Sequence, residues 1–238
     1  MAGGGRAVEV EPERLRGWFE RFAGRHGDLV EVDGTPDRVR FRTARGTSVE
    51  VVVPFGGLRA DHAPSTGSRA AAQEAHDPAG SAAGPWAVLD ALSAHLAAPR
   101  RIGIVLVRLG GYSIGVAVRG VVETSTTGAR PVHGRNRKGG SSSGRFARRR
   151  DNQVRVALDT AADAVARVLL PVADDLDAFV LGGYTAALDD LRADRRLAAL
   201  LARAEPRVLD VPEPRRAVLD EAARRARAVE LVIREPAG

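Results

Sequence analysis

The order of strand and helix patterns after residue 100 limits the possible folds of this chain more than any other feature. Apolar, β-branched runs over 102–108, 112–119 and 121–127 predict three strands in succession, with Gly110-Gly111 between the first two. Helix and strand patterns then alternate. We expect helices over about 151–170, 184–202 and 213–227, and strands over 177–182, 207–211 and 229–234. A meander followed by helix–strand alternation predicts an α/β (α+β) mixed sheet with helices packed on it.

A smaller domain is indicated before this region. Residues 11–23 predict an amphipathic helix, because the large apolar residues from Leu15 to Phe22 recur at helical spacing. Strand patterns follow over 29–32, 39–42 and 49–53, with glycine turns between them. We therefore expect a small N-terminal domain over residues 1–56, made of one helix and a three-stranded meander.

Residues 57–84 differ in composition from both neighbours. Gly, Ala, Ser, Pro, His and Asp dominate, and few side chains are both apolar and larger than alanine. Such a segment buries too little surface to offset the entropy lost on ordering, so we expect a flexible linker or long loop. A helix over about 85–98, with proline in its first turn, is expected to begin a second domain over 85–238.

Positive charge is concentrated in one segment, residues 130–150, which holds eight basic residues and no acidic one. The whole chain carries +6 and this segment +8, so the remainder is slightly acidic at −2. Clustered guanidinium groups favour phosphate partners. The glycine and serine content of the segment predicts a loop between the meander and the following helix. From composition alone, an RNA-binding loop and a basic loop with nonspecific anion affinity are both open.

Several classes of site are absent from the sequence. Without cysteine there are no disulfides or thiolate metal ligands, and no histidine pair has metal-binding spacing, so we expect no metal. No phosphate-binding Walker, dinucleotide or serine-hydrolase motif is complete, and we expect no cofactor. No apolar run is long enough to span a bilayer and no secretion signal precedes the first helix, so we expect a soluble cytoplasmic protein. Tyr112 and Tyr184 each follow a glycine pair and are expected to pack beside turns.

The segment from His133 to Gln153 resembles a known family. Two strands, then a Gly-Gly loop ending in Arg-Phe-Ala-Arg-Arg-Arg-Asp-Asn-Gln, are similar to the actinobacterial VLRF group of Vms-like release factors. That group is related to the catalytic domain of eukaryotic and archaeal peptide-release factors. The resemblance continues into Leu176–Gly183, which looks like the strand after the catalytic loop in those factors. It covers residues 100–238 well and the N-terminal part more vaguely.

The resemblance implies an RNase H-like fold and a peptidyl-tRNA hydrolase that frees nascent chains from stalled ribosomes. Its expected partners are the large ribosomal subunit and peptidyl-tRNA. In the catalytic loop, Gly139 and Gly140 would bring backbone N–H groups to the ester. The residues implied to bind tRNA and rRNA phosphates are Arg135, Arg137, Lys138, Arg145, Arg148, Arg149 and Arg150.

The sequence departs from the family pattern at one position. The family glutamine that places the attacking water is expected near Ser143, whereas the nearest glutamine, Gln153, comes about ten residues later. Ser143 is therefore the third candidate catalytic residue, as a substitute for that glutamine. The alternative is a noncatalytic ribosome- or tRNA-binding protein that has lost the glutamine. The oligomeric state is not predicted.

Overall fold

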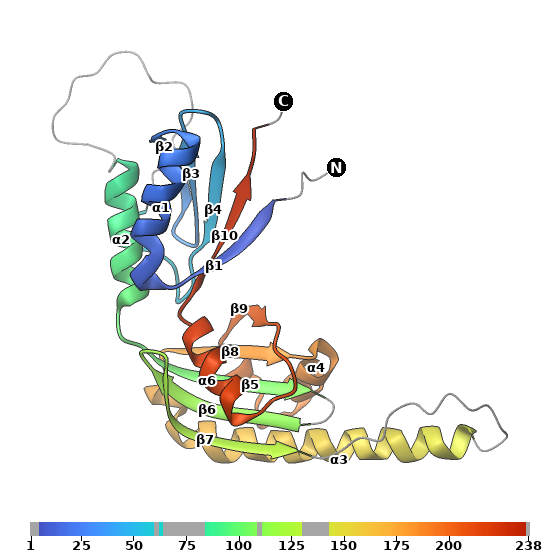
Figure 1. The fold of residues 1–238 in the computed structure, drawn as a ribbon. Coiled ribbons are helices and arrows are strands. Elements are labelled where there is room, and N and C mark those ends of the chain that lie inside the picture. The colour runs from blue at the N-terminus through green and yellow to red at the C-terminus, as the bar shows by residue number, and fades with distance from the viewer. Residues whose placement is uncertain (1–4, 60–61, 64–83, 109–110, 130–142, 237–238) are drawn as a thin grey trace. The chain divides into compact units, whose positions relative to one another are not determined.

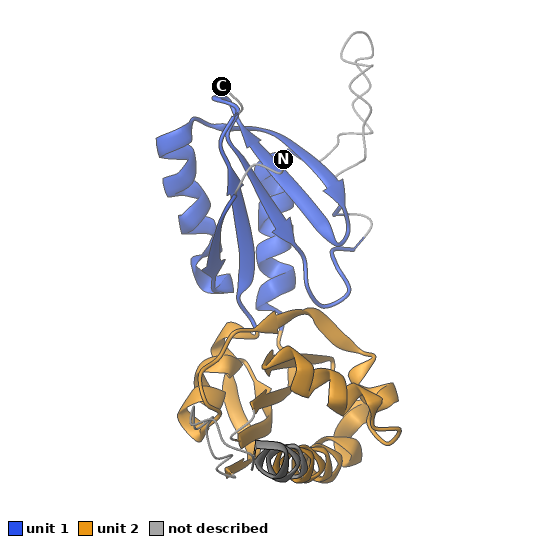
Figure 2. Ribbon diagram, turned by 90° about the vertical axis from the view of Figure 1, so that its right-hand side faces the viewer, with its two compact units in different colours: residues 1–98, 227–238 blue, residues 99–226 orange. Residues whose placement is uncertain are grey.

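The computed structural model describes residues 5–59, 62–63, 84–108, 111–129 and 143–236. It divides the chain into two compact units (Figure 2). Unit 1 consists of residues 1–98 and 227–238, and unit 2 of residues 99–226.

Unit 1 is a five-stranded antiparallel sheet with two helices on one face. The strands lie in the order β1-β10-β4-β3-β2, and α1 and α2 lie side by side against the sheet (Figure 1). Their buried side chains form one apolar core. The elements are β1 (Arg6–Val10), α1 (Pro12–His26), β2 (Leu29–Thr35), β3 (Arg38–Thr43), β4 (Ser48–Val52), α2 (Pro85–Ala97) and β10 (Val229–Arg234).

The predicted N-terminal meander is present as β2, β3 and β4, and the two compact units divide the chain at other residues than the predicted domains do. Strand β10, expected in the second domain, lies between β1 and β4, where Leu231 pairs with Val51. Helix α2 also belongs to unit 1, because its leucines share the core with α1. The start of the predicted linker belongs to unit 1, since Leu58 is buried in this core and its N–H donates to the Pro36 carbonyl at 2.7 Å. Most of the predicted linker, including residues 64–83, lies outside the described residues.

Unit 2 contains the mixed sheet that the sequence predicted. The strand order is β7-β6-β5-β8-β9, with antiparallel pairs from β7 to β5 and parallel pairs from β5 to β9, so the expected mixed sheet is confirmed. The elements are β5 (Arg101–Arg108), β6 (Gly111–Val118), β7 (Val121–Ala129), α3 (Ser143–Leu169), a 3₁₀ helix η1 (Leu170–Asp175), β8 (Ala178–Gly183), α4 (Thr185–Ala193), α5 (Ala198–Leu201), β9 (Ala204–Leu209) and α6 (Arg216–Arg225).

Helices cover both faces of this sheet. On one face α3, α4 and α5 pack over Val105, Ile114 and Phe179 (Figure 1). On the other face α6 lies over β5, β6 and β7. A Cβ added to Gly115 would be 3.0 Å from the Leu219 side chain, so glycine at this position lets α6 approach closely.

Three predicted helices have different limits in the structure. Helix α3 begins at Ser143 instead of near Asp151, so residues 143–150, predicted as loop, are helical. Arginine and alanine favour helix there, and an aspartate that could cap a helix can also lie inside one. The predicted helix 184–202 is interrupted after Ala193, where the Asp194 carboxylate accepts the Arg196 backbone N–H at 2.9 Å. Helix α6 begins at Arg216, after Pro214.

None of the helices in the described part of the chain is long and apolar enough to cross a bilayer.

Candidate functional site

One edge of the unit 2 sheet brings together the ends of several strands. Strands β5, β7 and β8 end there, and β6 begins there. Arg108 of β5 pairs with Gly111 of β6, and Gly111 pairs in turn with Ala129 of β7. On the other side of β5, Val107 pairs with Gly183 of β8. We call this row, Arg108, Gly111, Ala129 and Gly183, the carboxyl edge. The basic segment 130–150 starts directly after Ala129. The fold therefore attaches that segment to the carboxyl edge.

The predicted site residues fall into two groups. Gly139, Gly140, Arg135, Arg137 and Lys138 lie outside the described residues. The second group occupies the first turns of α3, where the backbone is described and the side chains are not; it consists of Ser143, Arg145, Arg148, Arg149 and Arg150. The assignment of these residues to catalysis and RNA binding therefore stays a prediction.

Helix α3 carries the second half of the basic segment. Its 27 residues give a length of about 40 Å. The C-terminal part packs on the sheet through buried residues such as Ala161, Val165 and Leu169. The N-terminal part extends past the sheet (Figure 1). One end of α3 is thus held in the core of unit 2 while the other carries the basic positions away from it.

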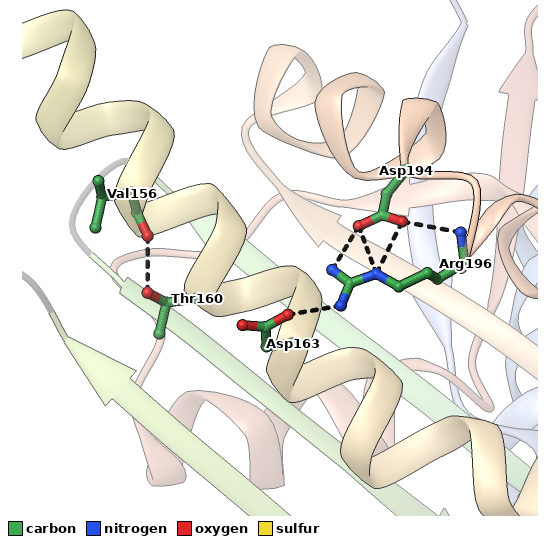
Figure 3. Close-up of polar contacts among 5 residues, drawn as sticks. All are labelled: Val156, Thr160, Asp163, Asp194 and Arg196. Carbon is green, nitrogen blue, oxygen red and sulfur yellow. Dashed lines mark hydrogen bonds and ion pairs between the residues drawn. The ribbon is translucent and has the colours of Figure 1, made fainter.

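A polar network ties α3 to the connection between α4 and α5 (Figure 3). The Arg196 guanidinium donates to Asp163 of α3 at 2.7 Å and, through its other nitrogens, to Asp194 at 2.7–3.2 Å. These hydrogen bonds from Arg196 lower the pKa of Asp194, and the two carboxylates raise the pKa of Arg196. One turn earlier in α3, the Thr160 hydroxyl donates to the Val156 carbonyl at 2.7 Å. The network fixes α3 at the level of Asp163.

A small cavity of about 100 Å³ lies at the carboxyl edge, between α3 and the ends of β5, β6 and β7. Tyr112 forms part of its wall and packs against the core, as expected from the sequence. Its ring covers Gly128 on the neighbouring strand, because a Cβ at Gly128 would be 2.5 Å from the ring. The cavity borders Ala129, the last described residue before the basic segment.

The side chain of Tyr184 is more exposed than the sequence analysis predicted. It was expected to pack beside a turn, but 47% of it is exposed at the start of α4. The preceding Gly183 has φ +110°, and the Tyr184 N–H donates to the Val107 carbonyl at 2.9 Å. The side chain borders a groove of about 660 Å³ between α3 and α4. This turn presents an aromatic ring next to the carboxyl edge, and the glycine pair before Tyr184 was the sequence signal for the turn.

Within the described residues there is no group of three or more His, Cys, Asp or Glu side chains that could hold a metal ion.

Comparison with known proteins identifies the family. The model of the Actinobacteria/chloroflexi VLRF1 release factor family matches residues 100–232. The chain belongs to this family. The match spans nearly all of unit 2, including the basic segment, and continues into β10. The description of the family is that of a release factor, so the chain is release-factor-like.

Among solved structures, the crystal structure of the archaeal translation termination factor aRF1 is similar at 19% sequence identity and a TM-score of 0.38. The similarity covers 51% of this chain and 33% of aRF1, so the chain spans about a third of that structure. A comparison with curated proteins gave no match.

Proposed function

We propose that this VLRF1 family member hydrolyses the ester bond of peptidyl-tRNA and so releases nascent chains from stalled ribosomes. The observation that carries the proposal is the family match, which includes residues 130–150. The attachment of that segment to the carboxyl edge supports it, because the segment follows β7 directly after Ala129 and its second part belongs to the long helix α3.

The proposed chemistry uses backbone, water and arginine. Water attacks the ester carbonyl carbon, and the oxygen of that carbonyl gains negative charge. Backbone N–H groups at Gly139 and Gly140 donate to this oxygen, as donors in an oxyanion hole do. The bond to the tRNA 3′ oxygen then breaks, that oxygen takes up a proton, and the peptide leaves with a free carboxylate. Ser143 takes over the role of the family glutamine and helps to orient the attacking water.

The basic positions of the segment are proposed to hold tRNA and rRNA phosphates. Positions 145, 148 and 149 follow each other at i, i+3 and i+4, so they fall on one side of α3. With Arg135, Arg137, Lys138 and Arg150 they make the segment the most positive part of the chain. Binding through several phosphates weakens steeply with salt. We therefore propose that ribosome binding depends on ionic strength.

A noncatalytic function is the second candidate, and the missing glutamine is the observation that favours it. In that case the chain binds the ribosome or tRNA through the same arginines without cleaving the ester. This noncatalytic candidate predicts that the chain releases no peptide. It also predicts salt-sensitive ribosome binding, which weakens when Arg148, Arg149 and Arg150 are changed to glutamine.

Release of peptide from stalled ribosome–nascent-chain complexes separates the two candidates. The hydrolase proposal predicts release by the unaltered chain and its loss in the double variant Gly139→Ala, Gly140→Ala. Gly24→Ala is a matched control, because an added Cβ there meets nothing within 4 Å. Release at the background rate, or release unaffected by the double variant, would refute the hydrolase proposal.

Ser143→Gln tests the proposed position of the missing glutamine. We expect it to raise the release rate, because the longer amide reaches the water from the start of α3. A rate equal to that of the unaltered chain contradicts the assignment of Ser143 while leaving the roles of the two glycines untouched.

A further inference from the structure

Unit 1 contains a groove whose wall is a column of aromatic rings. The groove measures about 590 Å³ and lies between α1 and the strands β1 and β10, with Val8 and Ile233 among its apolar lining. Along α1, the Phe22 ring stacks between two others: its centroid is 5.1 Å from that of Trp18 at an interplanar angle of 11°, and 4.5 Å from that of His26 at 26°. Phe22 is buried, while Trp18 and His26 are partly exposed. Both faces of the Phe22 ring are covered by its two neighbours, so the outer faces of Trp18 and His26 are the ring surfaces on which a planar group can stack.

The polar part of the groove is mainly cationic. Three exposed arginines line it, one from each surrounding element: Arg6 from β1, Arg25 from α1 and Arg234 from β10. The acidic residue at the groove is Glu235, whose carboxylate accepts a hydrogen bond from the Thr47 hydroxyl at 3.1 Å. The formal charge of the lining is therefore +2 with His26 neutral. An anionic ligand is favoured over a neutral or cationic one.

We infer that this groove binds a segment of single-stranded RNA. A base stacks against Trp18, whose ring the stacked Phe22 holds in place, and the arginines contact the adjacent phosphates. Aromatic platforms combined with a positively charged groove are the two elements with which proteins bind single strands without sequence preference. An acidic peptide satisfies the arginines equally well, but its carboxylates make no use of the ring surfaces, so the aromatic column favours RNA.

The inferred site is separate from the proposed catalytic function. The residues that line the groove all lie outside the family match over 100–232. The groove also lies within unit 1, whereas segment 130–150 belongs to unit 2. RNA binding at the groove can therefore succeed or fail independently of peptide release.

The two tryptophans of the chain provide a local assay. Trp86→Phe leaves Trp18, at the groove, as the sole tryptophan. Trp18→Phe leaves Trp86, which lies on α2 about 5.8 Å from the Arg16 guanidinium and does not line the groove. Both full-length variants are titrated with a ten-nucleotide oligouridylate while tryptophan fluorescence is recorded. We expect saturable quenching of Trp18 and little change at Trp86.

Charge variants test the phosphate contacts. Arg6→Gln with Arg234→Gln removes two contacts, so the slope of log affinity against log salt becomes shallower by about 1.4. That change corresponds to about a sevenfold smaller loss of affinity between 50 and 200 mM salt. Arg14→Gln with Arg21→Gln is the matched control, because both are exposed arginines of α1 outside the groove. The control should keep the slope of the unaltered chain.

Three results would overturn the inference: equal quenching of the two tryptophans, a salt slope unaffected by Arg6 and Arg234, or quenching of Trp18 by polyglutamate with the affinity of the RNA. The last result would assign the groove to an acidic peptide. RNA should still quench the fluorescence of Trp18 when Arg148, Arg149 and Arg150 of the basic segment are changed to glutamine. The test of the groove is therefore independent of the test of the proposed function.

Discussion

Gly183→Ala tests the backbone that joins β8 to α4 at the carboxyl edge. Gly183 has φ +110°, a conformation that residues with a side chain rarely adopt. A Cβ built there would lie 2.1 Å from the Val107 carbonyl oxygen and 2.9 Å from its carbon. Both are backbone atoms of the central strand β5, so they cannot rotate away as the end of a side chain would. The substitution must instead move the β8–α4 turn.

The cost follows from two contributions. A non-glycine residue held in such a conformation costs about 1–3 kcal/mol. Moving the turn also lengthens the 2.9 Å hydrogen bond from the Tyr184 N–H to Val107, which is worth about 1 kcal/mol. We therefore expect Gly183→Ala to lower the free energy of unfolding by about 2–4 kcal/mol.

Urea unfolding followed by far-ultraviolet circular dichroism measures this loss. Gly24→Ala is the control, because Gly24 lies inside α1 with nothing within 4 Å of an added Cβ. The same substitution there should raise stability by about 0.5–1 kcal/mol, since alanine favours helix over glycine. If Gly183→Ala stays within about 0.5 kcal/mol of the unaltered chain, as ordinary surface changes do, the strain argument is wrong.

Further predictions concern the core, the α3 network and the basic segment. Phe19→Ala removes a fully buried ring of the unit 1 core and should lower the free energy of unfolding by about 3–5 kcal/mol, seen as an earlier transition in tryptophan fluorescence. Hydrogen bonds from Arg196 lower the pKa of Asp194 below its ordinary value of 3.8. These hydrogen bonds therefore stabilise the folded state fully above pH 3.8, and the stabilisation is lost as the pH falls through the lowered pKa of Asp194. Thermal melts should accordingly show a weaker acid-side loss in Asp194→Asn than in the unaltered chain; parallel profiles would contradict this. In salt titrations of ribosome binding, the slope should become shallower by about 2 in the triple variant Arg148→Gln, Arg149→Gln, Arg150→Gln.

The sequence predicted most helices and strands because hydrophobic periodicity is a local signal. It failed at pairings between distant segments. The pattern of β10 indicates a strand but carries no information on which sheet it joins, and in the structure Leu231 pairs with Val51, far away in the chain. The start of α3 was also misplaced, because an aspartate that could cap a helix can also lie inside one, and the arginines before Asp151 favour helix.

The candidate site was only partly predictable. Its position between a meander and a helix follows from sequence order, and the structure attaches it to the carboxyl edge at Ala129. Tyr184 was missed because exposure depends on the direction in which Gly183 turns the chain, and that direction depends on contact with Val107 in another strand. The groove beside Trp18 was missed for a similar reason. Its arginines come from both ends of the sequence and meet only when β10 pairs with β1.

The position of β10 has a consequence for synthesis of the protein. Strands β1 to β4 of unit 1 leave the ribosome before the strands of unit 2, yet the unit 1 sheet lacks an inner strand until residues 229–234 have been made. All the residues of unit 2 are translated before that strand. Although domains generally fold from the N-terminus onward during synthesis, here the later unit has its complete set of strands first. Until β10 is made, β4 and β1 lack the strand that pairs with both of them, and their unpaired backbone groups are open to mispairing with other chains.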